Sequence, residues 1–221
     1  MGFVKSCLVN DHATDFVGRL AVADLPALCA PAGADPAQIL TPKTLSLPPR
    51  SFDRHKGMSG RVAILAGSRC YPGAARLCSA AAVKAGAGLV TLIVPSDCVA
   101  TLSASVIPEV MVWALDDFSV LLNEKWDAFG IGPGLGRERD EMICEFLRRC
   151  STPCVVDADA LNALSGQMDV VRENAGQRLL TPHHLEMERL SPCNGRDRLQ
   201  WLADFVSQYP VTLLLKGART L

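Results

Sequence analysis

Short apolar runs alternate with helical patterns from Arg61 to the end of the chain, and this alternation constrains the fold more than any other feature. The runs are rich in β-formers, and the segments between them carry alanine-rich or amphipathic patterns of helical length. Such alternation favours a mostly parallel sheet with helices on both faces. The sequence therefore predicts an α/β fold. Strands are expected at 61–67, 89–95, 110–115, 128–132, the start of 154–161, 178–182 and 211–215, with helices at 73–88, 118–125, 139–150 and 196–209.

The composition limits the kinds of partner that the protein could bind and indicates its cellular location. The chain has 221 residues and a formal net charge of −1, so no excess of positive charge favours nucleic acid or an anionic membrane. Its nine cysteines are scattered without a C-x-x-C pair, which favours a reduced, intracellular protein without a structural metal. No apolar stretch reaches membrane-spanning length, and the start lacks the apolar core of a signal peptide. We therefore expect a cytoplasmic protein that binds neither nucleic acid nor membrane.

Residues 1–54 differ from the rest of the chain because they combine many prolines with little periodicity. Such a composition is typical of a connecting or wrapping segment. The alternating pattern, and with it the predicted sheet, begins only after this segment.

Two glycine-containing loops follow predicted strands, where phosphate ligands collect in α/β proteins. The first, Gly67–Ala75, is neither a Walker P-loop nor a G-x-G-x-x-G fingerprint. Amide groups at the start of its helix, near Ala74, can meet a phosphate, although a plain tight turn explains the loop equally well. The second loop places Gly132, Gly134 and Gly136 at alternate positions. It is the more specific signal, since three spaced glycines are entropically unfavourable in a simple turn.

Charged and imidazole side chains follow the later strands. Asp157 and Asp159 are two positions apart, so in an extended segment they point to one side and could bind Mg²⁺ through water or act as an acid–base pair. Asp159 can instead cap the following helix. Thr181 is a candidate N-cap of the next helix, and His183 is expected to form hydrogen bonds rather than to bind zinc. Lys216, after the last strand, is a candidate phosphate-binding cation.

Taken in order, these motifs resemble those of the ADP- or ATP-dependent NAD(P)H-hydrate dehydratases, whose fold is similar to ribokinase. The matching segments are HKGMSGRVAILAGS, YPGAARLCSAAAVKAGAGLVTL, PEVMV, GIGPGLG, VVDADALN, LLTPHHLEMERL and LLLKGART. Their ordered combination is more specific than any single motif. Upstream, GRLAVADLPAL is similar to the closing strand of the NAD(P)HX epimerase domain that precedes the dehydratase in many bacterial versions. The resemblance implies a ribokinase-like three-layer sandwich for residues 55–221 and an epimerase remnant plus linker for residues 1–54.

The resemblance also implies the site residues and ligands. Hydrated NADH or NADPH, the S form of NAD(P)HX, is expected to bind at Ala74, Gly134, Gly136 and His183. ADP or ATP, with Mg²⁺, is expected to bind at the segment made of Lys216, Gly217, Ala218, Arg219 and Thr220. The short form of this last segment looks like the bacterial, ADP-using branch. Members of the family assemble as oligomers such as tetramers, so a homo-oligomer is implied.

The implied reaction is a dehydration, which makes the family a carbon–oxygen lyase. Hydroxide is a poor leaving group, so the C6 hydroxyl of the hydrated ring is phosphorylated first. Loss of phosphate, driven by the lone pair of the ring nitrogen, then restores the dihydropyridine, and AMP or ADP and phosphate are released. The protein's part in such chemistry is to position the reactants and to stabilise charge.

Two departures from the family pattern bear on activity. The family usually has Pro-Gly after Thr-Pro-His, whereas His184 and Leu185 precede Glu186 here, so the nicotinamide nucleotide is expected to be held differently. The family also continues past Lys-Gly with a Gly-Thr-Gly-Asp segment that supplies an anion hole and the catalytic aspartate, and no such segment occurs up to Leu221. We therefore expect the front part, about two-thirds, of a dehydratase domain. Its sheet would be incomplete at the C-terminus, and the chain would have no catalytic residue and no activity.

Two other functions stay open at this point. A different ribokinase-like phosphotransferase, such as a small-alcohol or vitamin-precursor kinase, would share the fold, although the order of the Gly-Pro-Gly-Leu-Gly and Thr-Pro-His segments favours the dehydratase. A degenerate nucleotide-binding or assembly subunit would share the fold without catalysis.

Overall fold

The computed structural model describes residues 55–172 and 176–221, together with Leu8, Ala13, residues 15–18, Leu20, Leu40 and residues 52–53. The chain separates into two units, Met1–Arg54 with Gly217–Arg219, and His55–Lys216 with Thr220–Leu221. In the first unit, the amides of Phe16 and Val17 both donate to the carbonyl of Ala13. The predicted linker and epimerase remnant lie almost entirely outside the described residues and stay a prediction. The fold below is that of the second unit.

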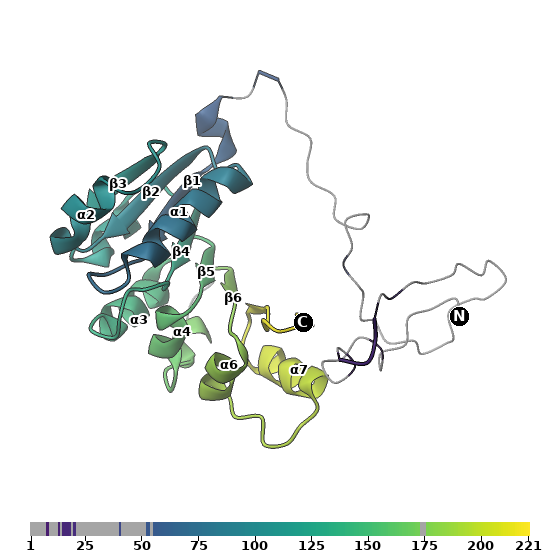
Figure 1. Ribbon diagram of the computed structural model, residues 1–221. Helices are drawn as coiled ribbons and strands as arrows, with labels where there is room; N and C mark the ends of the chain where they lie inside the picture. The colour runs from purple at the N-terminus through teal and green to yellow at the C-terminus, as the bar shows by residue number, and fades with distance from the viewer. Residues whose placement is uncertain are drawn as a thin grey trace. The chain divides into compact units, whose positions relative to one another are not determined.

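Seven strands form a single sheet in the order β3-β2-β1-β4-β5-β6-β7, and every pairing between them is parallel (Figure 1). The α/β fold with a mostly parallel sheet is therefore confirmed. Successive strands are added on one side of β1 as far as β3, and then, from β4 onward, on its other side. The strands are β1 (Arg61–Leu65), β2 (Leu89–Val94), β3 (Val110–Ala114), β4 (Ala128–Ile131), β5 (Cys154–Val156), β6 (Arg178–Leu180) and β7 (Thr212–Leu213).

Helices cover both faces of this sheet, as the sequence pattern predicts (Figure 1). The first long helix begins with a proline and ends at Gly86, whose φ of 99° is the left-handed conformation that glycine adopts readily. The α-helices are α1 (Pro72–Ala85), α2 (Val99–Ser103), α3 (Asp140–Arg149), α4 (Asp159–Leu164), α5 (Asp169–Arg172), α6 (His184–Leu190) and α7 (Arg198–Gln208). Short 3-10 helices are η3 (Lys56–Ser59), η4 (Ser96–Cys98) and η5 (Phe118–Asn123).

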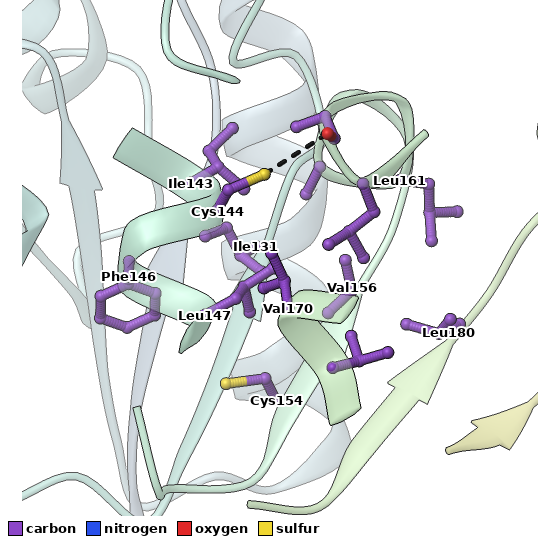
Figure 2. Packing of buried hydrophobic residues seen from close by; sticks show 14 of the residues in the cluster. Ile131, Ile143, Cys144, Phe146, Leu147, Cys154, Val156, Leu161, Val170 and Leu180 are labelled. Atoms are coloured by element: carbon purple, nitrogen blue, oxygen red, sulfur yellow. Dashed lines mark hydrogen bonds between the residues drawn. The ribbon is translucent and has the colours of Figure 1, made fainter. Parts of the chain in front are cut away.

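The strand residues alternate between two hydrophobic cores because successive side chains of a strand point to opposite faces. In β1, Ala63 and Leu65 belong to the larger core, whereas Ile64 packs in the smaller core under α1 and α2. The larger core joins the sheet to helices α3 to α7. Figure 2 shows part of it, with Ile131 and Val156 of the sheet beside Leu147 of α3. This packing fixes the strand ends from which the loops of the candidate site emerge.

The last strand is shorter than the predicted 211–215, although its parallel ladder continues beyond β7. The amide of Leu214 donates to the carbonyl of Leu180, and the amide of Lys216 donates to that of Pro182. Leu215 departs from this ladder because its amide pairs with the carbonyl of Leu221. Among the residues described, no helix combines the length and apolar character needed to cross a lipid bilayer.

Candidate functional site at the carboxyl edge of the sheet

The carboxyl ends of the central strands meet at one edge of the sheet. Backbone hydrogen bonds run from Gly132 N to Leu65 O (3.1 Å), from Asp157 N to Ile131 O (3.0 Å), and from Thr181 N to Val156 O (3.1 Å). The loops after β1, β4, β5 and β6 therefore start side by side. The loops after β1 and β4 also flank the point where the strand order reverses, which is where ligands bind in open α/β sheets.

The glycine loop after β4 lies directly against the start of α1. A Cβ atom added to Gly134 would come within 2.8 Å of the Cβ of Tyr71 and 2.9 Å of the Cβ of Ala74. The φ of Gly134, +72°, is also one that other residues rarely adopt. The amide of Gly67 donates to the carbonyl of Pro133 at 2.8 Å and holds the two loops together. Ala74 and Gly134, predicted as site residues from separate motifs, are thus in contact.

Two further glycines on this edge face open space. A Cβ atom added to Gly73, in the first turn of α1, or to Gly136 would meet no atom within 4 Å. The N-cap residue of α1, Tyr71, makes no side-chain capping hydrogen bond. The positive end of the helix dipole and the small surfaces of Gly73 and Gly136 are therefore available to an anionic ligand that approaches the backbone closely.

The two aspartates after β5 have different hydrogen-bond partners, and the extended backbone on which their predicted common direction depends is interrupted between them. Ala158 between them has φ 49° and ψ −117°, which ends the extended conformation that would align the two side chains. Asp157 turns toward Lys216, whereas the carboxylate of Asp159 accepts a hydrogen bond from Gly136 N at 2.9 Å. The prediction that Asp159 caps the helix is also wrong, because Ala158 is the N-cap of α4 and Asp159 is its first residue.

Lys216 lies between two carboxylates. Its Nζ is 2.7 Å from Oδ1 of Asp157 and 4.0 Å from Oε2 of Glu186. The Lys216 side chain is 40% exposed, so the ammonium group also reaches solvent. An ammonium group has three donors, and the one bonded to Asp157 fixes its position while leaving others for a ligand oxygen.

His183 begins α6 as its N-cap, which corrects the prediction that Thr181 caps this helix. Its Nδ1 accepts hydrogen bonds from the amides of Leu185 (3.1 Å) and Glu186 (3.2 Å), and Oε2 of Glu186 accepts one from the amide of His183 (2.8 Å). Thr181 cannot cap the helix because it still belongs to the sheet ladder. The His183 side chain is 49% exposed, and its backbone pairs with that of Lys216.

The residues that depart from the family pattern occupy the first turn of α6. His184 contacts Trp201 of α7 edge-on, with ring centroids 5.5 Å apart, whereas Leu185 is exposed. His184 therefore packs α6 against α7 and lies outside the hydrogen bonds that cap the helix.

Burial and charge at this edge keep one nearby thiol protonated. Cys78, on α1, has its pKa raised first by burial and second by the negative charge of Asp157. A thiol with a raised pKa is a poor nucleophile, so the edge contributes backbone amides, carboxylates and a lysine rather than a reactive sulfur.

The described carboxylates of this edge do not belong to a cluster of side chains that could hold a metal ion directly. Within residues 55–172 and 176–221, no group of three or more histidine, cysteine, aspartate or glutamate side chains is arranged to hold a metal ion. Asp157 and Asp159 already accept hydrogen bonds from Lys216 and Gly136, respectively. A metal ion held directly by three or more side chains therefore does not fit, and Mg²⁺ held through water at Asp157 and Asp159 stays a prediction.

The structure brings most of the predicted site residues to one edge. Gly134 contacts Ala74, and Gly136 in the same glycine loop donates to Asp159 in the loop after β5. Asp157, also in the loop after β5, accepts a hydrogen bond from Lys216. The backbone of Lys216 in turn pairs with that of His183. Gly217, Ala218 and Arg219 fall in the other unit, so their placement at this edge stays a prediction, as does the role of Thr220. Sequence reasoning missed the partnership of Glu186, although its position three residues after His183 is the spacing of a capping box.

Comparisons with known proteins give the same family throughout. A family model described as NAD(P)H-hydrate dehydratase matches residues 62–221. A bifunctional NAD(P)H-hydrate repair enzyme of Moorella thermoacetica is 38% identical and covers 98% of this chain, which in turn covers 45% of that enzyme. An ADP-dependent (S)-NAD(P)H-hydrate dehydratase of Lactococcus lactis is 34% identical over 75% of this chain and 62% of its own length. The chain thus spans about half the length of the bifunctional relatives that it matches.

Solved structures agree with this assignment. A ribokinase-like superfamily protein of Enterococcus faecalis superposes with a TM-score of 0.68 at 28% identity, over 78% of this chain and 62% of its own. An ADP/ATP-dependent NAD(P)H-hydrate dehydratase of Bacillus subtilis, co-crystallised with ATP and Mg²⁺, superposes with a TM-score of 0.65 at 28% identity, over 79% of this chain and 64% of its own. The fold is therefore ribokinase-like, and by sequence and structure together this chain belongs to the NAD(P)H-hydrate dehydratase family.

Proposed function

We propose that this chain takes part in the repair of hydrated NADH and NADPH, by ADP- or ATP-dependent dehydration of the S form of NAD(P)HX to NAD(P)H. The observation that carries the proposal is the contact of Gly134 with the start of α1, on the same sheet edge as the Asp157–Lys216 pair. We assign two sets of phosphate-binding groups to this edge, because the reaction needs two nucleotides. Membership of the dehydratase family supports the assignment of each set.

We assign the hydrated nicotinamide nucleotide to the half of the edge built by α1 and the glycine loop. Gly73 and Gly136 leave open space there, and the amides at the start of α1 lack a side-chain cap. A diphosphate is a suitable occupant because it can accept hydrogen bonds from several backbone amides at once. Ala74 and Gly134 are expected to shape the floor of this half. His183, predicted for the same ligand, lies beside Lys216, and its exposed imidazole would have to reach the ligand from there.

We assign the phosphoryl donor to the half next to Lys216. Its ammonium group is held by Asp157 and reaches solvent, so it can neutralise a phosphate without first being ordered. Gly217, Ala218, Arg219 and Thr220 follow Lys216 in the sequence and are expected to complete this half. The dehydratase of Bacillus subtilis that superposes on this chain was crystallised with ATP and Mg²⁺, which supports an adenine nucleotide as the donor.

In this reaction the described residues position the two nucleotides and neutralise the charge of their phosphates, and they transfer no proton. Lys216 draws charge from the donor phosphates, and the amides of the α1 start hold the substrate, so that its ring hydroxyl faces the terminal phosphate. Phosphorylation turns hydroxide into phosphate, which the ring nitrogen lone pair can expel. Because no group of three or more side chains among the described residues could hold a metal ion directly, we expect any Mg²⁺ to arrive on the nucleotide phosphates with its water ligands.

We further propose that residues 55–221 belong to a dehydratase domain and residues 1–54 to the end of an epimerase domain with its linker. The bifunctional repair enzymes that match up to 99% of this chain support this division. The homo-oligomer implied by the resemblance, the cytoplasmic location and the preference for ADP over ATP stay predictions.

Calorimetric titration tests the proposed function without depending on turnover. The purified chain is titrated with hydrated NADH and with ADP or ATP, and with NAD⁺ as a control ligand. We expect saturable binding of hydrated NADH and of one adenine nucleotide, each unaffected or strengthened by the other. Binding or phosphorylation of a sugar or vitamin alcohol in place of hydrated NADH would reject the dehydratase assignment in favour of another ribokinase-like kinase.

A further inference from the structure

Two cysteine thiols outside the candidate site are in contact with one another. Cys150, the C-cap residue that follows α3, and Cys154, which begins β5, are both buried, and their Sγ atoms lie 3.8 Å apart. The Sγ of Cys154 can also donate to the carbonyl of Thr152 at 3.3 Å, in the short turn that joins them. Two sulfurs in van der Waals contact across a short turn can form a bond after a small side-chain movement.

A buried cation lies beside this pair. Arg178 of β6 is 3% exposed, and its guanidinium donates to the carbonyls of Cys150, Leu147 and Thr152. These partners are neutral, so the positive charge can stabilise a thiolate that forms next to it. A free thiol with a resolving thiol within reach and a cation at its side is the arrangement typical of redox-active cysteines.

A groove reaches one member of the pair, Cys154, whose sulfur contacts Cys150 behind it. It has a volume of about 540 Å³ and runs along the amino ends of strands β4 to β7, with Cys154 and Arg178 among its lining residues. The groove is wide enough for a small oxidant, since a volume of about 30 Å³ already accommodates a water molecule.

We propose that Cys150 and Cys154 form a reversible intramolecular disulfide when the protein meets a small peroxide. The Cys150 thiol first loses its proton to solvent, and its thiolate attacks one peroxide oxygen. The O–O bond breaks, the sulfur becomes a sulfenic acid, and the other oxygen leaves as hydroxide, which takes up a proton from solvent to become water. The sulfur of Cys154 then attacks the sulfenic sulfur and displaces hydroxide, which takes the proton of the Cys154 thiol. In total, two thiols and one hydrogen peroxide give one disulfide and two waters. A dithiol reductant reverses the change.

The electrostatics of the pair assign the attacking sulfur. The pKa of Cys150 is lowered to about 7, chiefly by the hydrogen bond from Cys154 and further by Thr152 and by Arg178, against the opposing effect of burial. The pKa of Cys154 is raised, first by that same hydrogen bond and then by burial. Cys150 is therefore the thiolate near neutral pH, and Cys154 is the thiol that resolves it.

Peptide mapping tests the proposal on the full chain. The protein is treated with hydrogen peroxide, denatured, alkylated with iodoacetamide, reduced, and labelled with N-ethylmaleimide. Trypsin releases residues 150–172, a peptide whose cysteines are Cys150 and Cys154 alone. We expect this peptide to carry two maleimide labels, and to lose two hydrogen masses when the reduction is omitted. Cys98 and Cys144 are equally buried controls with raised pKa values, and we expect them to oxidise at least about tenfold more slowly.

Each other outcome overturns the proposal. Full alkylation of both thiols would show that the oxidant does not react there. A sulfinic acid on Cys150 with a free Cys154 would show that the second sulfur cannot resolve the first, and a linkage to any other peptide would show that the pair is not the preferred partner. Cys154→Ser should trap the intermediate, so that Cys150 reacts with a 1,3-dione probe for sulfenic acids.

Discussion

The Nζ atom of Lys216 donates a hydrogen bond to Oδ1 of Asp157 at 2.7 Å, although the two residues are 59 positions apart in the sequence. Asp157 follows β5 and Lys216 follows β7, the strands on either side of β6. Both side chains are partly exposed, and an ion pair of this kind contributes only about 0–1 kcal/mol to stability. The pair therefore orients Lys216 more than it holds the fold together. Substitutions there should change ligand binding while leaving the protein folded.

Lys216→Ala should weaken binding of ADP or ATP by about tenfold or more, because a hydrogen bond to a charged group contributes about 1.5–3 kcal/mol. The free energy of unfolding should change by less than about 1 kcal/mol. Calorimetric titration gives the affinity, and urea denaturation gives the stability. Lys84→Ala, at an exposed position in the last turn of α1, is the matched control and should leave the affinity unchanged. Equal affinities of both variants would remove Lys216 from the donor site.

Gly136→Ala should weaken binding of hydrated NADH, because the added methyl group would occupy the open space that we assign to the substrate. Gly166→Ala is a closely matched control. The two glycines have φ values of +77° and +78°, and neither added Cβ would meet another atom within 4 Å. Both substitutions should lower stability by about 1–2 kcal/mol through the same backbone strain.

Only the binding data distinguish these two glycines. Titration with hydrated NADH should show a lower affinity for the Gly136 variant and the wild-type affinity for the Gly166 variant. A loss of affinity in both variants would mean that strain, rather than occupied space, is responsible, and the substrate would have to be placed elsewhere.

The sheet and its helices could be predicted from the sequence because burial imposes a local pattern. Leu89–Val94 and Arg198–Gln208 carry that pattern within their own residues. Helix starts could not be predicted in the same way, because several residues compete for the capping position. Thr181 has the better side chain for an N-cap, but the ladder to Val156 keeps it in the sheet, and His183 takes the position instead.

In the candidate site, too, the sequence predicts the residue types of the loops but not the contacts between them. The glycine loops and Lys216 could be found because their residue types are unusual at strand ends. The contact of Gly134 with Ala74 and the pairing of Asp157 with Lys216 depend on strand order, which no local pattern contains. The different partners of the two aspartates depend on the conformation of Ala158, which alanine adopts only when its surroundings impose it.

His183 can be tested for two separate roles. His183→Ala should lower stability by about 1 kcal/mol, because the amides of Leu185 and Glu186 lose their acceptor. His183→Asn should keep most of that stability, since asparagine is a good N-cap. If the exposed imidazole also contacts the substrate, both variants should bind hydrated NADH more weakly. Thermal unfolding and titration of the two variants separate these effects, and wild-type affinity in both would limit His183 to capping.

The rate of peroxide oxidation of Cys150 should depend on pH with a midpoint near its pKa of about 7. The thiolate is the reactive form, so the rate should rise with pH through this midpoint and then level off. In Cys154→Ser the thiol donor that lowers this pKa most is replaced, and the midpoint should shift to a different pH. The groups that face Cys150 are Cys154, Thr152 and Arg178. Labelling of the sulfenic acid at a series of pH values measures the midpoint, and a rate independent of pH would exclude Cys150 as the attacking thiolate.

Ala158→Gly should leave the protein as stable as the wild type or make it more stable. Ala158 has a φ of 49°, a left-handed value that a side chain disfavours, and such strain amounts to about 1–3 kcal/mol. Glycine removes the strain but loses about 0.5–1 kcal/mol through the larger entropy of its unfolded chain, so the two effects nearly cancel or favour the variant. Ala81→Gly lies at an exposed position within α1, where alanine is not strained. This variant has only the entropic loss of glycine and should be less stable by about 1 kcal/mol. Urea denaturation of both variants makes the comparison. An equal loss of stability would mean that the turn between Asp157 and Asp159 stores no strain, and that hydrogen bonds to Gly136 and Lys216 alone set the directions of the two carboxylates.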